Sequence, residues 1–142
     1  MRPKSIVMFE RLLLASIALS AATFAVGYEA MLAAMAGDPR LQAAGLGGGF
    51  LIGSVLAEYA IYLVLWYLIA RRGVNWAKWV FVAVLALGLL SVPSALGGPI
   101  NLLVVLGLAV VALRVLAAIN LFRPDAIAWL RGEDETDPAA FD

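Results

Sequence analysis

The chain contains no cysteine and no histidine. Without cysteine it cannot exchange disulfides or use a thiolate nucleophile. Without histidine it lacks the usual base of a catalytic triad, and the absence of both removes the common ligands of zinc and haem. No other nucleophile–base pair is visible. We therefore expect no cofactor, no metal site and no catalytic residues.

Charged residues are also scarce. They make up 14% of the 142 residues, whereas apolar residues make up 64%, and the mean hydropathy is +0.97. A soluble domain averages roughly 45–50% apolar and about 25% charged residues. The ten basic and ten acidic residues cancel, and they form no basic patch of the kind that nucleic acid requires. The composition indicates an integral membrane protein whose surroundings are the lipid bilayer, with no nucleic-acid partner.

The apolar residues gather into four long runs. A transmembrane helix needs about 20 apolar residues to cross a hydrocarbon layer ~30 Å thick, and each run is long enough. The runs lack the alternation of β-barrel strands. We therefore predict an all-α fold, a four-helix transmembrane bundle in one domain over residues 1–131. The predicted helices are 6–35, 47–70, 76–96 and 100–121, with a tight turn rather than a re-entrant pore loop before the last.

The first run begins with basic residues, as a cleaved signal peptide does. A possible cleavage site of small residues at Ala34–Ala36 lies too far beyond the apolar stretch, however, and acidic Glu10 interrupts the basic start. We therefore expect the first helix to be retained.

Basic residues near the helix ends lie mostly on one side of the membrane if the chain crosses four times. Only Arg40 lies on the other side, and tryptophan and tyrosine residues concentrate at the basic boundary. Cytoplasmic loops carry an excess of lysine and arginine. We therefore predict that both termini lie in the cytoplasm. The residues on the basic side are Arg2, Lys4, Arg11, Arg71, Arg72, Lys78, Arg123 and Arg131.

The segment after the fourth run predicts a short interfacial helix over Pro124–Arg131. Proline suits the first position of a helix, and Ile127, Trp129 and Leu130 suit a contact with lipid. Residues 132–142 are acidic and contain no basic residue, which predicts a disordered, solvated tail. A partner-binding role for this tail is the alternative.

Of the ionisable residues in or near the apolar runs, three matter most: Glu10, Glu58 and Arg114. A charge inside the bilayer costs roughly 2.5–3.5 kcal/mol on insertion scales, so each needs a partner or water. Helix rise places Glu58 ~18 Å and Arg114 ~10 Å from the cytoplasmic ends of their helices, and Glu10 only a few residues into its own. We predict that Arg114 pairs with Glu10, and otherwise with Glu58. We expect the pair to fix helix order rather than to serve transport.

Ser54, Glu58 and Tyr62 follow one another at a spacing of four residues and form a polar stripe on the second predicted helix. Ser54 and Tyr62 can each donate a hydrogen bond to the Glu58 carboxylate. Without a basic partner, burial would favour the protonated form of Glu58, and such a carboxyl suits proton-coupled transport. The alternative is a neutral acid that is merely hydrogen-bonded to its neighbours.

Small residues form a second stripe on the same helix, roughly a quarter turn from the polar one. Small residues at this spacing let helix backbones approach closely. We predict a protein contact here, with packing against the first or fourth helix slightly favoured over self-association. The stripe consists of Gly45, Gly49, Gly53 and Ala57.

On the fourth predicted helix, Gly107 and Ala118 share one side with Arg114, at spacings of seven and four residues. Small residues mark helix contacts in membranes. We therefore predict a packing role for Gly107 and an inward direction for Arg114.

Three segments resemble one family of membrane proteins. Residues 2–10 (RPKSIVMFE), 71–79 (RRGVNWAKW) and 122–129 (FRPDAIAW) are similar to the opening, the central loop and the post-helix segment of small four-helix inner-membrane proteins of proteobacteria. The resemblance implies a four-helix inner-membrane protein and no particular activity. Small multidrug transporters have a similar size and a glutamate in their first helix, but Glu10 lies near the membrane boundary, so their function does not follow.

These observations favour a non-enzymatic role. We expect a small scaffold or accessory subunit that packs against other membrane protein subunits or against itself. The alternative is a small proton-linked transporter or channel that uses Glu58, and a membrane enzyme ranks third.

Overall fold

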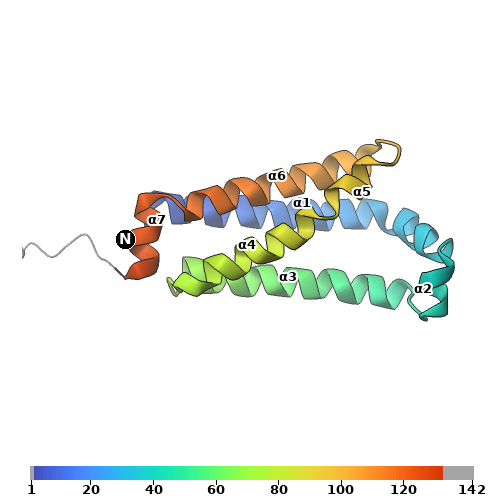
Figure 1. The fold of residues 1–142 in the computed structure, drawn as a ribbon, viewed down its shortest axis with the longest axis horizontal. Coiled ribbons are helices and arrows are strands. Elements are labelled where there is room, and N and C mark those ends of the chain that lie inside the picture. Colours follow the sequence, from blue (N-terminus) through green and yellow to red (C-terminus); the bar gives the residue numbers. More distant parts are fainter. Residues whose placement is uncertain (1, 133–142) are drawn as a thin grey trace, which may run out of the picture.

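A computed structural model describes residues 2–132, and these residues form seven helices (Figure 1). Four helices are long: α1 (Lys4–Ala36), α3 (Gly48–Ala70), α4 (Asn75–Leu89) and α6 (Leu102–Leu121). Three are short: α2 (Pro39–Ala43), α5 (Val92–Leu96) and α7 (Pro124–Arg131). The all-α four-helix bundle with a short C-terminal helix is confirmed. The predicted acidic tail, apart from its first residue Gly132, lies outside the described residues.

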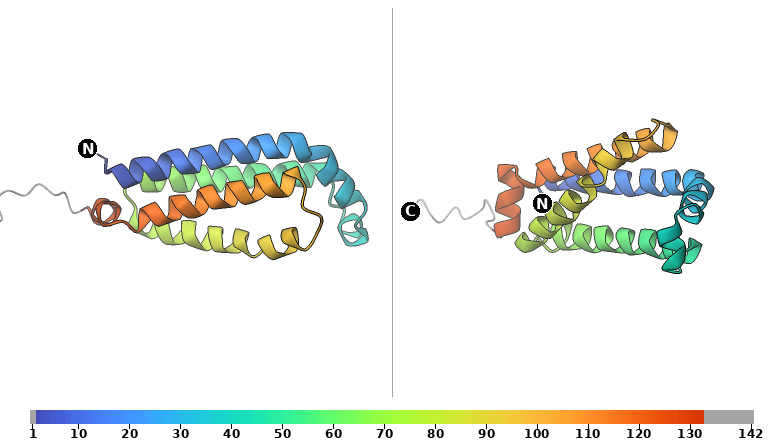
Figure 2. Two further views of the ribbon diagram at one scale, coloured as in Figure 1. Left: turned by 90° about the horizontal axis from the view of Figure 1, so that it is seen from above. Right: turned by 45° about the vertical axis from the view of Figure 1, so that its right-hand side comes forward.

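The four long helices run alternately in opposite directions (Figures 1 and 2). Helix α1 packs beside α3 and α6, and α4 packs beside the same two helices. Helices α4 and α5 together form one span that is long and apolar enough to cross a bilayer, and α1, α3 and α6 form three more. The chain is therefore a membrane protein. The start of α1, the turn between α3 and α4, and α7 all lie at one end of the bundle. We call it the basic end, because the eight predicted basic residues lie at or near it.

The hydrophobic core lies in the half of the bundle nearest the basic end. Phe9 of α1, Tyr62 of α3 and Phe81 of α4 are buried there. The Phe9 and Phe81 rings meet edge to face with centroids 5.4 Å apart, and Tyr62 meets Phe81 at 5.9 Å. In contrast, no residue of 28–61 or 86–109 is buried. The half farther from the basic end, which we call the open half, therefore leaves its apolar side chains partly or fully exposed.

The third predicted helix, 76–96, corresponds to one span, Asn75–Leu96, but the structure divides this span into α4 and α5 at Leu90 and Ser91. Pro93 explains the break. Proline has no backbone N–H, and its ring clashes with the carbonyl four residues earlier, here that of Leu89. The chain tightens instead, and the Ser91 N–H donates to the Gly88 carbonyl at 3.1 Å.

Helix α7 runs across the basic end of the bundle and is docked on it (Figure 1). The Trp129 indole donates to the Ile69 carbonyl at 3.3 Å, and Leu130 is buried. The prediction that Leu130 contacts lipid was therefore wrong, because this face of α7 packs on protein. Ser5 donates two hydrogen bonds to the Asp125 carboxylate, from its hydroxyl at 2.7 Å and its N–H at 3.1 Å.

We predict that acid loosens the docking of α7. The Ser5 hydrogen bonds lower the pKa of Asp125. A carboxyl with a lowered folded-state pKa stabilises the fold above its unfolded-state pKa, about 3.9, and this stabilisation is lost as the pH falls through the folded-state pKa. Asp125→Asn should therefore unfold at a lower temperature than the wild type at neutral pH, and this difference should vanish in acid. The measurement is thermal unfolding in detergent across that pH range, with Glu29→Gln on the exposed face of α1 as control. A constant difference at every pH would contradict it.

Candidate functional site

Arg114 and Glu58 form an ion pair between α6 and α3. The Arg114 Nη1 donates to the Glu58 Oε1 at 2.7 Å. The arginine side chain is 10% exposed, whereas the glutamate side chain is 42% exposed. The predicted pairing of Arg114 with Glu10 was wrong, and the second choice, Glu58, is the partner.

Side-chain direction explains why Glu10 is not the partner. Side chains on a helix lean toward its N-terminus. The N-terminus of α6 lies at the open half, so Arg114 reaches away from the basic end and up to the depth of Glu58. The N-terminus of α1 lies at the basic end, so Glu10 leans the other way. There it pairs with Arg2, and with Arg71 at 3.6 Å.

The Tyr62 ring holds the Arg114 guanidinium in place. The guanidinium carbon lies 4.1 Å from the centre of this ring, which is a cation–π contact, and Tyr62 is 2% exposed. Within residues 2–132, neither Tyr62 nor Ser54 donates the predicted hydrogen bond to Glu58. Ser54 is exposed and donates to the carbonyl of Leu51, one turn back in its own helix, as serine does in helix interiors. Tyr62 belongs to the site through its ring, and Ser54 does not belong to it.

Arg114 is incompletely hydrogen-bonded. Its Nε and Nη2 are buried and have no hydrogen-bond partner among the described residues. A guanidinium carries five N–H donors, and a buried donor without an acceptor costs about 1–3 kcal/mol. The bilayer interior supplies no acceptor from lipid tails. The ion pair therefore leaves part of the arginine unsatisfied.

A cavity of about 300 Å³ lies beside the ion pair, between α1, α3 and α6. Its wall is mainly apolar, and its polar groups are the ion pair and three hydroxyls, of which Tyr59 donates to Ser20 at 3.2 Å. An apolar cavity with a few convergent polar groups is typical of a small-molecule site. The lining residues are Ser20, Thr23, Phe24, Met31, Val55, Glu58, Tyr59, Leu103, Gly107, Val110, Val111 and Arg114.

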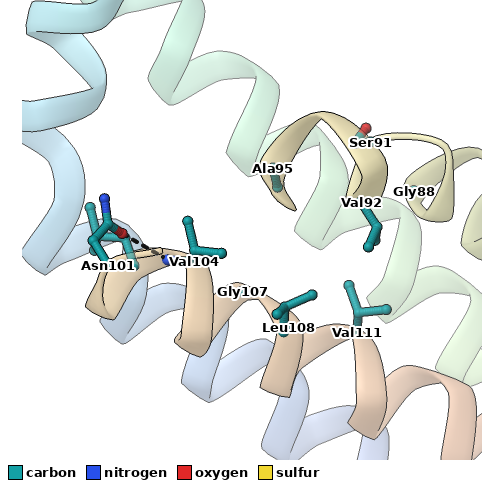
Figure 3. A pocket seen from close by; sticks show the side chains of 10 residues that line it. Gly88, Ser91, Val92, Ala95, Asn101, Val104, Gly107, Leu108 and Val111 are labelled. Atoms are coloured by element: carbon teal, nitrogen blue, oxygen red, sulfur yellow. Dashed lines mark hydrogen bonds between the residues drawn. The ribbon is translucent and has the colours of Figure 1, made fainter. Parts of the chain in front are cut away.

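A second cavity, of about 340 Å³, lies in the open half between the α4–α5 break and α6 (Figure 3). Asn101 caps α6 at its edge and accepts a hydrogen bond from the Val104 N–H at 3.0 Å. Gly107 lines both cavities, and an added Cβ there would meet nothing within 4 Å. The predicted packing role of Gly107 was therefore wrong, since the missing side chain makes space instead of a contact. Ala118 is buried beside Arg114 as predicted.

The small-residue stripe faces away from the bundle. Gly49, Gly53 and Ala57 are exposed, and a Cβ added at either glycine would meet nothing within 4 Å. Packing of this stripe against the first or fourth helix was a wrong prediction, because α3 buries a different face, that of Tyr62, Leu65 and Ile69. The fourth small residue, Gly45, is not in α3 at all. It lies in the preceding turn with a φ of 69°, a conformation that favours glycine.

Sequence reasoning missed the glycine that does bring two helices together. Gly27 of α1 is buried, and a Cβ there would lie 2.9 Å from a methyl carbon of Leu103 on α6. It also missed the burial of Lys78, whose amine lies 5.6 Å from the Trp79 ring and 5.8 Å from that of Phe122. A single glycine in an apolar run does not indicate which helix packs against it. The aromatic partners of Lys78 were visible only as part of a boundary belt.

No family model, curated protein sequence or solved structure matches this chain. The resemblance to small proteobacterial membrane proteins therefore stays a prediction. What the chain does is inferred from its geometry alone.

We predict that the two halves of the ion pair have unequal effects on stability. Breaking one side of a buried pair costs about 3–5 kcal/mol, because it strands the other charge. Glu58→Gln strands the buried arginine, which cannot lose its proton, whereas Arg114→Gln strands a half-exposed glutamate that can take one up. Glu58→Gln should therefore lower detergent stability more, and the double variant should recover part of the loss. Additive losses in this cycle would contradict the pairing.

Proposed function

We propose that this protein is a small accessory or scaffold subunit of the bacterial inner membrane that holds a partner transmembrane helix against α3. The observation that carries the proposal is the outward glycine face, which we define as Gly49, Gly53 and Ala57. This face lies within a membrane-spanning helix and is exposed, and a Cβ added at either glycine would meet nothing within 4 Å. The partner is another membrane protein subunit or a second copy of this chain.

The energetics of glycine support a contact on this face. Each glycine inside a helix costs about 1 kcal/mol relative to alanine. Between helices in lipid, small residues offset that cost, because they permit close van der Waals packing of two backbones. Within the described residues, no helix backbone packs against the outward glycine face, so the cost of its glycines is not offset there. A helix docked from outside supplies this packing.

We predict that Gly49→Leu and Gly53→Leu each remove partner binding or self-association without lowering the stability of the isolated protein. Both leucines would project into open space, so the internal packing should not change. The measurements are co-purification in mild detergent, oligomeric mass and thermal unfolding. Gly88→Leu on α4 is the matched control, because an added Cβ there also meets nothing within 4 Å. Unchanged assembly in both α3 variants, or an equal loss in the control, would overturn the proposal.

The orientation belongs to the same proposal. The basic end carries the start of α1 and also α7, and this supports an orientation with both ends of the described chain on one side of the membrane. The excess of lysine and arginine at this end favours the cytoplasm.

We predict that reporter fusions at Gly73 and at the C-terminus are active in the cytoplasm, whereas fusions at Gly37 and Gly98 are active in the periplasm. The reason is the distribution of basic residues between the two ends. Paired alkaline phosphatase and green fluorescent protein fusions at each position provide the measurement and its internal control. A C-terminal fusion active only in the periplasm would reverse the assignment.

A second candidate is a small proton-linked transporter or channel that uses Glu58. The cavity beside Glu58 and the exposure of its carboxylate favour it. Arg114 opposes a simple form of it, because its guanidinium already holds the Glu58 carboxylate in an ion pair at 2.7 Å. Proton transfer at Glu58 therefore requires the ion pair to open. The expectation that the chain is not an enzyme stays a prediction.

A further inference from the structure

We propose that the cavity between α1, α3 and α6 binds a small monocarboxylate with an apolar body, whose carboxylate displaces Glu58 from the Arg114 guanidinium. The proposal goes beyond the accessory role, because α3 contributes Val55, Glu58 and Tyr59 to the cavity and a different face to the partner helix. The ligand is defined by three features of the site: the free donors, the charge count and the wall.

The N–H donors of the Arg114 guanidinium favour a ligand group with two acceptor oxygens. Glu58 occupies Nη1 only, while Nη2 is buried and has no hydrogen-bond partner among residues 2–132, so a ligand reaches it only after Glu58 turns away. A guanidinium binds a carboxylate best through two parallel N–H···O bonds. A ligand carboxylate that takes both Nη1 and Nη2 therefore makes one more bond than Glu58 does.

The two partners differ in their freedom to move. Arg114 is nine-tenths buried and is stacked on Tyr62, so it stays in place. The Glu58 side chain is 42% exposed, so packing holds it less firmly than it holds the arginine. The arginine is thus the fixed receptor, and the glutamate is the part that yields.

The charge count selects a monoanion. The ionisable groups that face Glu58 are Arg114 from α6, and Tyr59 and Tyr62 from its own helix, while α1 contributes only the hydroxyls of Ser20 and Thr23. The site therefore holds a single cation. When the ligand takes it, Glu58 is left as an unpaired carboxylate in the bilayer interior, and the uptake of one proton removes that charge. The loaded site is then neutral: one carboxylate anion and one proton enter together.

The wall selects an apolar body. Phe24 and Met31 of α1, Val55 of α3 and Leu103 of α6 surround the polar groups. Apolar walls stabilise a bound ligand through the area that they remove from water, and few polar groups are needed to orient it. Hexanoate fits this chemistry as a probe, with a carboxylate head and a short hydrocarbon body.

The experiment is titration calorimetry on the full chain in detergent, with hexanoate, hexanol and hexylamine as probes that differ only in the head group. Hexanoate should bind at least about tenfold more tightly than the other two, a difference of about 1.4 kcal/mol. Titrations in buffers of different ionisation enthalpy should show uptake of about one proton with the wild type and of none with Glu58→Gln. Equal binding of hexylamine or hexanol would overturn the proposal.

Two variants locate the site without breaking the ion pair. Gly107→Leu places a side chain into open space in the cavity wall and should abolish hexanoate binding while the protein stays folded. Gly88→Leu fills space only in the second cavity and should leave binding intact.

A third variant alters the ion pair itself: Arg114→Lys keeps the charge but loses the paired donors, and it should weaken binding. Binding that survives Gly107→Leu would place hexanoate elsewhere and overturn the assignment.

The source of the carboxylate is distinguished by chain length. A soluble organic acid as the natural ligand predicts that hexanoate binds as well as palmitate does. A membrane-derived fatty acid predicts much tighter binding of palmitate, presented in nanodiscs, and the same sensitivity to Gly107→Leu. Hexyl phosphate at neutral pH tests the charge count, because its dianionic form should bind less well than hexanoate. Preference for hexyl phosphate would overturn the choice of a monocarboxylate.

Discussion

The permanent positive charge of Arg114 constrains the whole arrangement of the bundle. An arginine cannot neutralise itself by losing a proton, and α6 places this one in the apolar interior. It therefore needs a partner, and an anion on another helix of the bundle is one that holds it in the interior. Glu58 supplies the anion from α3, and the Tyr62 ring, one turn further along α3, supplies a second attraction. Together they fix both the distance between α3 and α6 and their register along the membrane normal.

A separate set of contacts closes the basic end. The Phe9, Phe81 and Tyr62 rings join α1, α4 and α3. Ser5 joins α1 to α7 through Asp125. Tyr62 belongs to both sets, since its ring packs on Phe81 and also carries the guanidinium of Arg114. Packing of the core and placement of the charge are thus coupled through one side chain.

The sequence predicted what depends on the distribution of apolar residues, and it failed where the direction of a side chain decides. The four spans and α7 followed from run length, proline positions and charge. The partner of Arg114 did not, because depth was counted at the backbone and took no account of the opposite directions in which Glu10 and Arg114 lean. The face buried by α3 was missed for a related reason. An almost uniformly apolar helix gives no periodic signal, so nothing in the sequence separates the core side of Tyr62 from the outward side of Gly53.

The division of the bundle into a packed half and an open half connects these findings to function. Binding sites draw on the less stable parts of a structure, because ligands and partners need groups that are free to respond. In the packed half, the buried Tyr62 ring holds the Arg114 guanidinium from the side of the basic end, so the cation is preorganised. Glu58, Tyr59 and Gly107 lie just above it, in the region where α4 breaks before Pro93 and no side chain is buried between 86 and 109. A rigid cation at the floor of an open, apolar half is an arrangement that can accept an anion without disturbing the core. The outward glycine face of α3 lies in the same half, where no residue of 28–61 is buried, but it points away from the cavity.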